Sequence, residues 1–207
     1  MFPRRVNVSI PRPDLSAREA VQLVESEIVG LGTAWVPVWI AAAGGVGFNG
    51  RLFSSHAAWQ FLFVNAKDPD VISMMIFGTG RLSIAKSQSG VPALPAIDLS
   101  GNWLDSTTAC ELAGMDDVSL EYEFDSSQHM KLYVANGIGM FWEIRRTSLG
   151  KPTDSRIQFS QVLDAYSGMV VGGTLARSID GEFVVFRRRM QGFGNLWQDV
   201  RVEGRIN

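Results

Sequence analysis

The chain is poor in the residues that usually carry metal and redox chemistry. Its 207 residues include one cysteine and two histidines. A single cysteine cannot form an intramolecular disulfide, and Cys110, His56 and His129 lie too far apart in the sequence for a zinc site. We therefore expect no metal site, and no motif in the chain indicates a cofactor.

An excess of charge of one sign and long apolar runs are also missing. Nineteen Lys and Arg residues face 21 Asp and Glu residues, which gives a formal net charge of −2 and a pI near 5.7. This balance argues against a general nucleic-acid binder. A membrane-spanning helix needs about 18 consecutive apolar residues, and glycine or proline interrupts every apolar run of this chain before that length. We expect a chain that does not span a membrane.

The sequence leaves the compartment open. Residues 1–11 contain no apolar run of signal-peptide length, which favours the cytoplasm. A mature periplasmic or extracellular form would look the same if its signal peptide had been removed, since many exported domains lack disulfides. Whether the chain forms a homo-oligomer is open as well.

The chain does have enough apolar sequence for a core, with 46% hydrophobic residues, and it has local signals for two helices. Ser16 and Glu19 form a capping-box pattern in front of apolar residues at helical spacing, and Gly32 ends the run. Asp105 is a suitable N-cap for a shorter helix over 106–113.

Most of the remaining chain is typical of β-strands. β-branched and aromatic residues gather in segments that Gly, Pro, Asn and Asp separate. These segments are 34–42, 59–65, 71–77, 81–85, 118–124, 130–135, 140–146, 157–163, 174–179, 182–190 and 197–202. Short helices among antiparallel strands predict an α+β fold, and Asp180 and Gly181 predict the turn of a C-terminal hairpin.

A proline-containing stretch near the middle of the chain, 91–104, is interpreted as a linker. It separates a first α+β unit, 1–90, from a second unit with the C-terminal hairpin, 105–207. Each unit opens with a capped helix and later offers a Trp-x-apolar strand, at Trp59 and at Trp142. This shared order raises the hypothesis of an internal repeat, although the two halves have negligible sequence identity.

A short motif in the second half carries a family resemblance. In Asp164-Ala165-Tyr166-Ser167-Gly168, the aspartate can accept hydrogen bonds from the turn and the glycine can supply a positive φ angle. Preceded by a small helix and several strands, 105–171 resembles the PepSY family, whose domains end in a strand with an Asp-Ala-x-x-Gly turn. The first half has Phe77-Gly78-Thr79-Gly80 in that place instead.

The resemblance implies a helix packed on a curved antiparallel sheet, a cystatin-like shape, which the first half would duplicate if the repeat is real. Members of the family are usually not enzymes, and they bind or restrain other proteins, often peptidases, at the cell envelope. It therefore implies a non-enzymatic accessory protein of bacterial type that holds a protein partner through a sheet face or edge.

Two groups of residues are candidates for partner binding: two tryptophans on one strand, and basic and aromatic residues near the C-terminus. They are Trp35, Trp39, Arg187, Arg189, Trp197 and Arg201. Strand alternation predicts one shared face for the two tryptophans and one for Arg187 and Arg189. Such a patch suits an acidic partner or a lipid headgroup. The alternatives are core or subunit contacts for the tryptophans, and a charged edge that prevents aggregation for the arginines.

Two other function classes stay open. A small molecule could bind between helix and curved sheet. A hydrolase using Ser55 and His56 is the third hypothesis, but the chain has no Gly-x-Ser-x-Gly motif. The glycines of 45–50 match G-x-G-x-x-G, yet no β-α alternation follows, so we interpret them as a hairpin loop rather than a nucleotide site.

Overall fold

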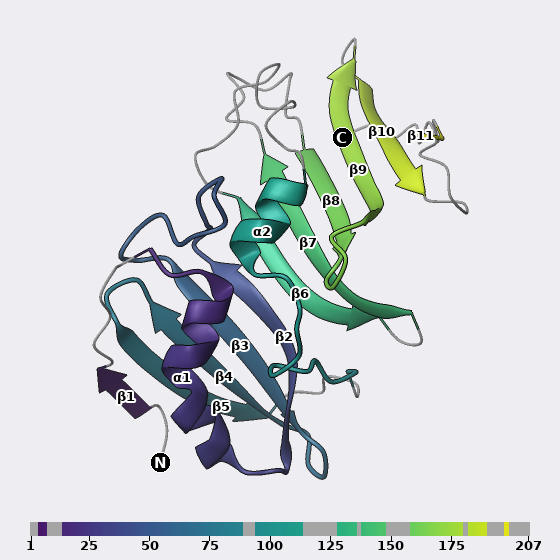
Figure 1. The fold of residues 1–207 in the computed structure, drawn as a ribbon. Coiled ribbons are helices and arrows are strands. Elements are labelled where there is room, and N and C mark those ends of the chain that lie inside the picture. Colours follow the sequence, from purple (N-terminus) through teal and green to yellow (C-terminus); the bar gives the residue numbers. More distant parts are fainter. Residues whose placement is uncertain are drawn as a thin grey trace.

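A single antiparallel sheet with two helices on one of its faces makes up the described part of the chain (Figure 1). The structure is a computed structural model of the chain, and it describes residues 4–7, 14–88, 94–113, 128–135, 138–147, 158–179, 182–189 and 197–198. The α+β class expected from the sequence is confirmed at this level, with strands predominating.

Both helices begin where the sequence predicts. Helix α1 spans Ala17–Leu31, and the Ser16 hydroxyl accepts a hydrogen bond from the Glu19 N–H while the Glu19 carboxylate accepts one from the Ser16 N–H. Helix α2 spans Ser106–Leu112, and the Asp105 carboxylate accepts a hydrogen bond of 2.7 Å from the Ser106 N–H. These caps satisfy backbone donors that the first turn leaves without helical partners.

The strands of the described chain form one open sheet, eleven-stranded, in the order β1-β5-β4-β3-β2-β6-β7-β8-β9-β10-β11. Their bounds are β1 Arg4–Asn7, β2 Trp35–Ala43, β3 Ala58–Asn65, β4 Asp70–Phe77, β5 Arg81–Gln88, β6 His129–Ala135, β7 Gly139–Thr147, β8 Gln158–Asp164, β9 Val170–Ile179, β10 Glu182–Arg189 and β11 Trp197–Gln198. The segments 118–124 and 199–202, which we expect to be strands, lie outside the described residues.

The order of strand pairing is similar after each of the two helices. After α1, strands β2, β3, β4 and β5 each pair with the next, and after α2, strands β6, β7, β8 and β9 do the same. The first strands of the two series, β2 and β6, pair antiparallel at the middle of the sheet, where Ile40 lies opposite Leu132. Figure 1 shows the two series spreading from this central pair.

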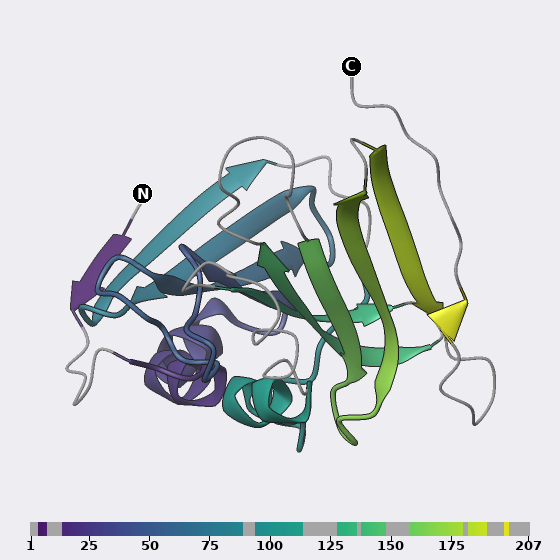
Figure 2. The ribbon, with the colours of Figure 1, turned by 90° about the horizontal axis from the view of Figure 1, so that it is seen from above.

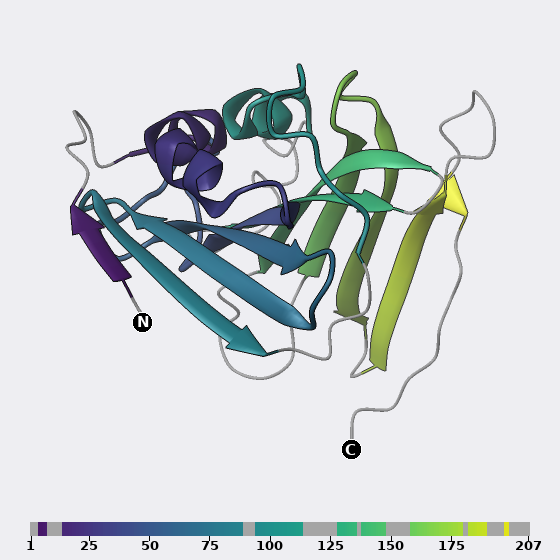
Figure 3. The same cartoon turned by 90° about the horizontal axis from the view of Figure 1, so that it is seen from below.

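One hydrophobic core runs beneath both helices. Figures 2 and 3 show α1 and α2 side by side over the same face of the sheet. Buried residues from α1, α2 and strands of both series belong to a single cluster. Trp142 lies at its centre, with ring centroids 6.4 Å from Trp59 and 6.1 Å from Trp103, both in edge-to-face geometry. The second part of the expected linker also packs here, since Trp103 is 1% exposed.

The expectation that Trp35 and Trp39 share a face is wrong, because a β-bulge lies between them. The register of β2 against β3 shifts between Pro37 and Trp39, so Val38 is an extra residue in the pairing. Trp35 packs against the core beneath the helices, whereas Trp39 lies opposite Leu62 and Tyr133, which are not part of that core. The two tryptophans therefore do not form a joint surface.

Candidate functional site

Neither helix covers the opposite face of the sheet, which we call the helix-free face (Figures 2 and 3). On the central strands its side chains alternate with core residues such as Ile40, Leu132 and Trp142. Its central residues are Trp39 and Ala41 of β2, Lys131 and Tyr133 of β6, and Phe141, Glu143 and Arg145 of β7. This face is the candidate functional site.

An aromatic row crosses the helix-free face. Trp39 lies opposite Tyr133, and Tyr133 lies opposite Phe141, with 6.3 Å between the Tyr133 and Phe141 ring centroids. The Lys131 ammonium lies over two of these rings, 5.4 Å from the Trp39 centroid and 5.7 Å from the Tyr133 centroid. Cation–π contacts of this kind contribute about 0.5–1 kcal/mol each at exposed sites.

A hollow lies beside the aromatic row because the next cross-strand row contains a small residue. Ala41 lies opposite Lys131, which lies opposite Glu143. The hollow has a volume of about 450 Å³, and its lining residues are Ala41, Ala42, His129, Met130, Lys131, Glu143 and Arg145. The small side chain of Ala41 beside the long side chain of Lys131 leaves room that a side chain from another molecule can fill.

The charges around the hollow are unequal. Arg145 donates to the Glu143 carboxylate from Nε at 2.7 Å, and its Nη2 lies 2.6 Å from the same oxygen. Lys131 has no carboxylate within ion-pair distance among the described residues. Two cations therefore accompany one carboxylate, and the Arg145 side chain is 63% exposed. Arg81 is a cation of the same face but lies on β5, four strands away from β6, with its guanidinium 4.4 Å over the Phe77 ring, so it does not contribute to the charge at the hollow. The local potential favours an anionic group.

Tyr133 is held in its neutral form at this site. Partial burial raises the pKa of its phenol, the Glu143 carboxylate raises that pKa further, and Arg145 opposes the shift. The hydroxyl therefore stays protonated and able to donate a hydrogen bond throughout the neutral pH range.

The arginines that the sequence analysis selects lie on β10, in the same sheet. Arg187 is paired in register with Thr174 of β9, and Arg189 with Gly172. Trp197 lies opposite Arg188, so the register does not bring it opposite either of the two selected arginines. Arg201 lies outside the described residues.

The Asp164–Gly168 turn joins β8 to β9 and has the geometry that its sequence indicates. The Asp164 carboxylate accepts hydrogen bonds from the Ser167 N–H at 2.7 Å and the Tyr166 N–H at 3.1 Å. Burial works to raise the pKa of Asp164, but these bonds outweigh it and lower the pKa. Gly168 has φ 72°, and a Cβ there would lie 2.2 Å from a Leu112 methyl carbon, so the turn packs against α2.

The glycine-rich stretch 45–50 joins the two halves instead of opening a helix. Gly50 accepts a hydrogen bond from the Ser106 hydroxyl at 2.7 Å, and a Cβ on Gly50 would lie 2.3 Å from the Ser106 carbonyl oxygen. No helix follows over the described residues 51–57. The glycines are therefore required by close backbone packing, and the arrangement lacks the helix N-terminus that a dinucleotide site uses.

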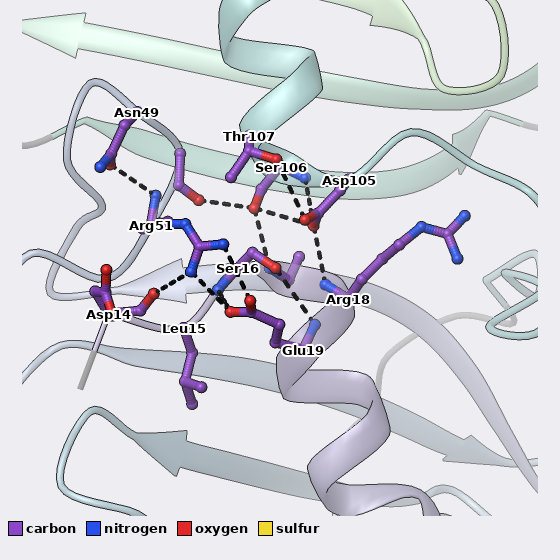
Figure 4. A network of polar contacts seen from close by, with 12 residues as sticks. Asp14, Leu15, Ser16, Arg18, Glu19, Asn49, Arg51, Asp105, Ser106 and Thr107 are labelled. Atoms are coloured by element: carbon purple, nitrogen blue, oxygen red, sulfur yellow. Dashed lines mark hydrogen bonds and ion pairs between the residues drawn. The ribbon is translucent and has the colours of Figure 1, made fainter. Parts of the chain in front are cut away.

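The helix N-termini meet at the same place (Figure 4). Asp105 Oδ1 accepts from its own helix at Ser106 N–H and from α1 at the Arg18 N–H, 3.0 Å away. The Ser106 hydroxyl also accepts from the Ala17 N–H at 3.0 Å. Asp105, the N-cap of α2, and Ser106, its first residue, thus accept hydrogen bonds from the first turn of α1, which fixes the two helices relative to each other.

The structure does not assemble a hydrolase site from the described residues around Ser55 and His56. His56 lies exposed in the turn before β3, and no described hydrogen bond joins it to a serine. The nearby Ser54 hydroxyl accepts from the Ala57 N–H at 3.2 Å. Within the described ranges, no group of three or more His, Cys, Asp or Glu residues is placed to hold a metal ion.

Cys110 belongs to a buried polar cluster beneath α2. The Gln128 amide nitrogen lies 2.6 Å from the Cys110 sulfur, and the Gln128 amide oxygen accepts from Arg146 Nε at 2.8 Å. Arg146 is 1% exposed, and its guanidinium stacks 4.2 Å over the Phe48 ring. The cluster connects α2, β6 and β7, and it buries the only thiol of the chain.

Comparisons with known proteins add no assignment. No protein-family model matches the chain, no curated protein matches it, and no solved structure matches it. None of the described helices is both long and apolar enough to cross a lipid bilayer. The geometry of the site therefore carries the functional argument.

Sequence reasoning missed Lys131, Tyr133, Glu143 and Arg145. A signal was present, because these residues fall on the parity opposite to the apolar Leu132, Trp142 and Ile144 in two strands that the sequence predicts. Their assembly into one site depends on the pairing of β2 with β6, and no local pattern in the sequence encodes that pairing.

Proposed function

We propose that the chain is a non-enzymatic accessory protein that binds a partner protein on the helix-free face of its sheet. The observation that carries this proposal is the position of Lys131, whose ammonium lies over Trp39 and Tyr133 without a carboxylate partner among the described residues. Tryptophan, tyrosine and arginine are the residue types that contribute most to protein interfaces. Here Trp39 and Tyr133 form a row beside a hollow that Lys131 and Arg145 line, on the face of the sheet that neither helix covers.

Binding of a small molecule between helix and sheet has less support. That space is filled by Trp59, Trp103 and Trp142, each at most 1% exposed. A separate hollow of about 480 Å³ is lined by α1 and by residues 99–103, and no described strand residue lines it. A ligand in the inner position would require the core to open.

We also propose that the two halves are structural repeats, a hypothesis that the shared order of elements in the sequence raises. Two observations support this: each half has a helix followed by consecutively paired strands, four in the first half (β2 to β5) and six in the second (β6 to β11), and each has a tryptophan on the second of these strands. The Trp59 indole donates to the carbonyl of Leu15, and the Trp142 indole donates to that of Leu104. Each acceptor is the residue just before the N-cap of the helix in the same half.

Co-purification tests the binding function. Tagged wild-type protein, Trp39→Ala and Lys131→Gln are recovered from the native cell under identical conditions, and the bound proteins are identified by mass spectrometry. Lys86→Gln is the matched control, since Lys86 also lies over a tryptophan, Trp35, but on the helix side of the sheet and paired with Asp70.

We expect a partner that the wild type and Lys86→Gln retain and that Trp39→Ala and Lys131→Gln lose. A cooperative thermal unfolding transition near that of the wild type is required of each variant, so that loss of the partner is not caused by loss of the fold. A partner held equally by all four proteins contradicts the proposed surface, as does the absence of any such partner.

A further inference from the structure

We infer that the helix-free face recognises an extended acidic segment of the partner protein, which lies across strands β6 to β10. This inference rests on the proposed function and adds the chemistry and the direction of the bound segment. It is carried by the register of the sheet together with the charges around the hollow.

Two cross-strand rows connect the hollow to the arginines of β10. Each row begins at residues that line the hollow and follows paired residues through β7, β8 and β9. The first is Lys131, Glu143, Val162, Gly172 and Arg189, and the second is His129, Arg145, Ser160, Thr174 and Arg187. Each row has a basic residue near the hollow and another at β10, with small or uncharged residues at β8 and β9.

The distance from β6 to β10 along the rows sets the length of the bound segment. From β6 to β10 there are four steps between neighbouring strands, and at about 4.8 Å a step this is about 19 Å. An extended chain covers about 3.3 Å per residue, so about six residues span the rows. Because the rows run perpendicular to the strands, the segment lies on the face of the sheet and does not add a strand to its edge.

The hollow fits the first acidic side chain of such a segment. Its lining residues include the small Ala41 and the cationic Lys131 and Arg145. Glu143, two residues away on the same strand, holds the Arg145 guanidinium through one carboxylate oxygen, which keeps the Arg145 side chain beside the hollow. A basic segment would meet Lys131 and Arg145 at close range, which like-charge repulsion disfavours.

The aromatic row supplies the apolar side of the contact. Trp39, Tyr133 and Phe141 cross the same strands one pair of residues away from the hollow. The methylene groups of glutamate and the backbone of an extended segment can pack on the partly exposed rings of Trp39 and Tyr133 while the carboxylates reach the cations, and Phe141, which is 7% exposed, packs beside Tyr133. An extended segment that contains glutamate therefore fits better than a uniformly charged surface.

The test uses the full chain and a fluorescein-labelled octapeptide of alternating Glu and Ser, whose glutamates all face one side when the peptide is extended. Fluorescence anisotropy at about 50 mM NaCl keeps electrostatic screening low. The matched control peptide alternates Gln and Ser. We expect the acidic peptide to bind and the Gln peptide to bind at least about tenfold more weakly.

Protein variants locate the peptide on the rows. Lys131→Gln, Arg145→Gln and the pair Arg187→Gln with Arg189→Gln should each weaken binding about fivefold or more. Lys86→Gln should change binding less than about twofold, because Lys86 is paired with Asp70 on the other face. Equal binding of the two peptides, or full binding by Lys131→Gln, would overturn the inference.

Two further experiments distinguish an acidic segment from a membrane surface and from a partner that binds without one. If phosphatidylglycerol vesicles bind the chain and the acidic peptide does not, the face recognises a membrane surface and the inference is wrong. If Trp39→Ala loses the partner while Lys131→Gln and Arg145→Gln keep it, the proposed function stands and the inference of an acidic segment is wrong. If Trp39→Ala also retains the partner, the proposed function itself fails.

Discussion

Trp59 of β3 and Trp142 of β7 touch each other in the core beneath the helices. Their ring centroids lie 6.4 Å apart in edge-to-face geometry. The Trp59 indole donates a hydrogen bond of 2.9 Å to the Leu15 carbonyl, and the Trp142 indole donates one of 2.8 Å to the Leu104 carbonyl. Each bond fixes a helix start to a strand, and the ring contact joins the two pairs.

Replacing these tryptophans should therefore reveal coupling. Leu15 O also accepts from the Leu52 N–H, whereas no second described donor reaches Leu104 O. We expect Trp59→Phe to lower the free energy of unfolding by about 1–2 kcal/mol and Trp142→Phe to lower it by about 2–3 kcal/mol. The second loss is larger because the Leu104 carbonyl would keep no described donor, whereas the Leu15 carbonyl would keep the Leu52 N–H. A double-mutant cycle by urea unfolding should give a coupling energy of at least about 0.5 kcal/mol. If the losses of the two single variants simply add in the double variant, the contact between the two rings is contradicted.

Asp105 should contribute to both helices. Its carboxylate accepts from the Ser106 N–H and the Arg18 N–H, so Asp105→Ala removes a cap from α2 and a contact from α1. We expect a loss of about 2 kcal/mol in the free energy of unfolding, against about 1 kcal/mol for an ordinary N-cap. Asp98→Ala, in an exposed turn, is the control and should cost less than about 0.5 kcal/mol. Equal losses in the two variants would be inconsistent with this role.

The Glu19–Arg51 pair predicts a pH dependence of stability. The hydrogen bond from Arg51 lowers the pKa of Glu19, burial opposes it, and the bond from the Ser16 N–H lowers the pKa further. A lowered pKa contributes stability that is present above the unfolded value of about 4.3 and is lost as pH falls through the folded value.

Glu19→Gln should therefore unfold at a lower temperature than wild type at neutral pH. The difference should be below about 1 kcal/mol, because the Glu19 side chain is 42% exposed. It should shrink below about pH 4. Glu25→Gln on the same helix is the control, with no ion pair among the described residues. A difference that grows on acidification would refute the role given to this pair.

Tyr133 should ionise at higher pH than an ordinary tyrosine. Burial and the Glu143 carboxylate raise its pKa, so the protonated phenol contributes stability below about pH 10 that is lost as pH rises through the folded value. The ultraviolet difference titration between wild type and Tyr133→Phe should show a midpoint above about 10. Glu143→Gln should lower that midpoint, and a midpoint unaffected by Glu143→Gln would show that burial alone sets it.

Local chemistry in the sequence is sufficient to predict both helices. The Ser16 and Glu19 pair and the Asp105 cap act on backbone groups within a few residues, so their signals are contained in short stretches of sequence. The Asp164 turn is predictable for the same reason, because its side chain bonds to amides two and three residues ahead.

The candidate site is less predictable because it depends on long-range pairing. Alternation alone places Trp35 with Trp39, and only the bulge at Val38, which forms against β3, separates them. Lys131 comes beside Trp39 through the pairing of β6 with β2, between residues about ninety positions apart. The glycines of 45–50 indicate a tight backbone, but the Ser106 carbonyl that requires Gly50 belongs to the other half of the chain.

Site-specific photocrosslinking in the native cell tests the central claim most directly. Benzoylphenylalanine is placed at His129, an exposed residue on the rim of the hollow, and in a second protein at Val29, which is 74% exposed on α1. The helix-free face predicts a crosslinked partner from position 129 and none from position 29, and the position-129 product should disappear when Lys131→Gln is added. Crosslinks that arise from position 29 alone would place the interface on the helices and contradict the account.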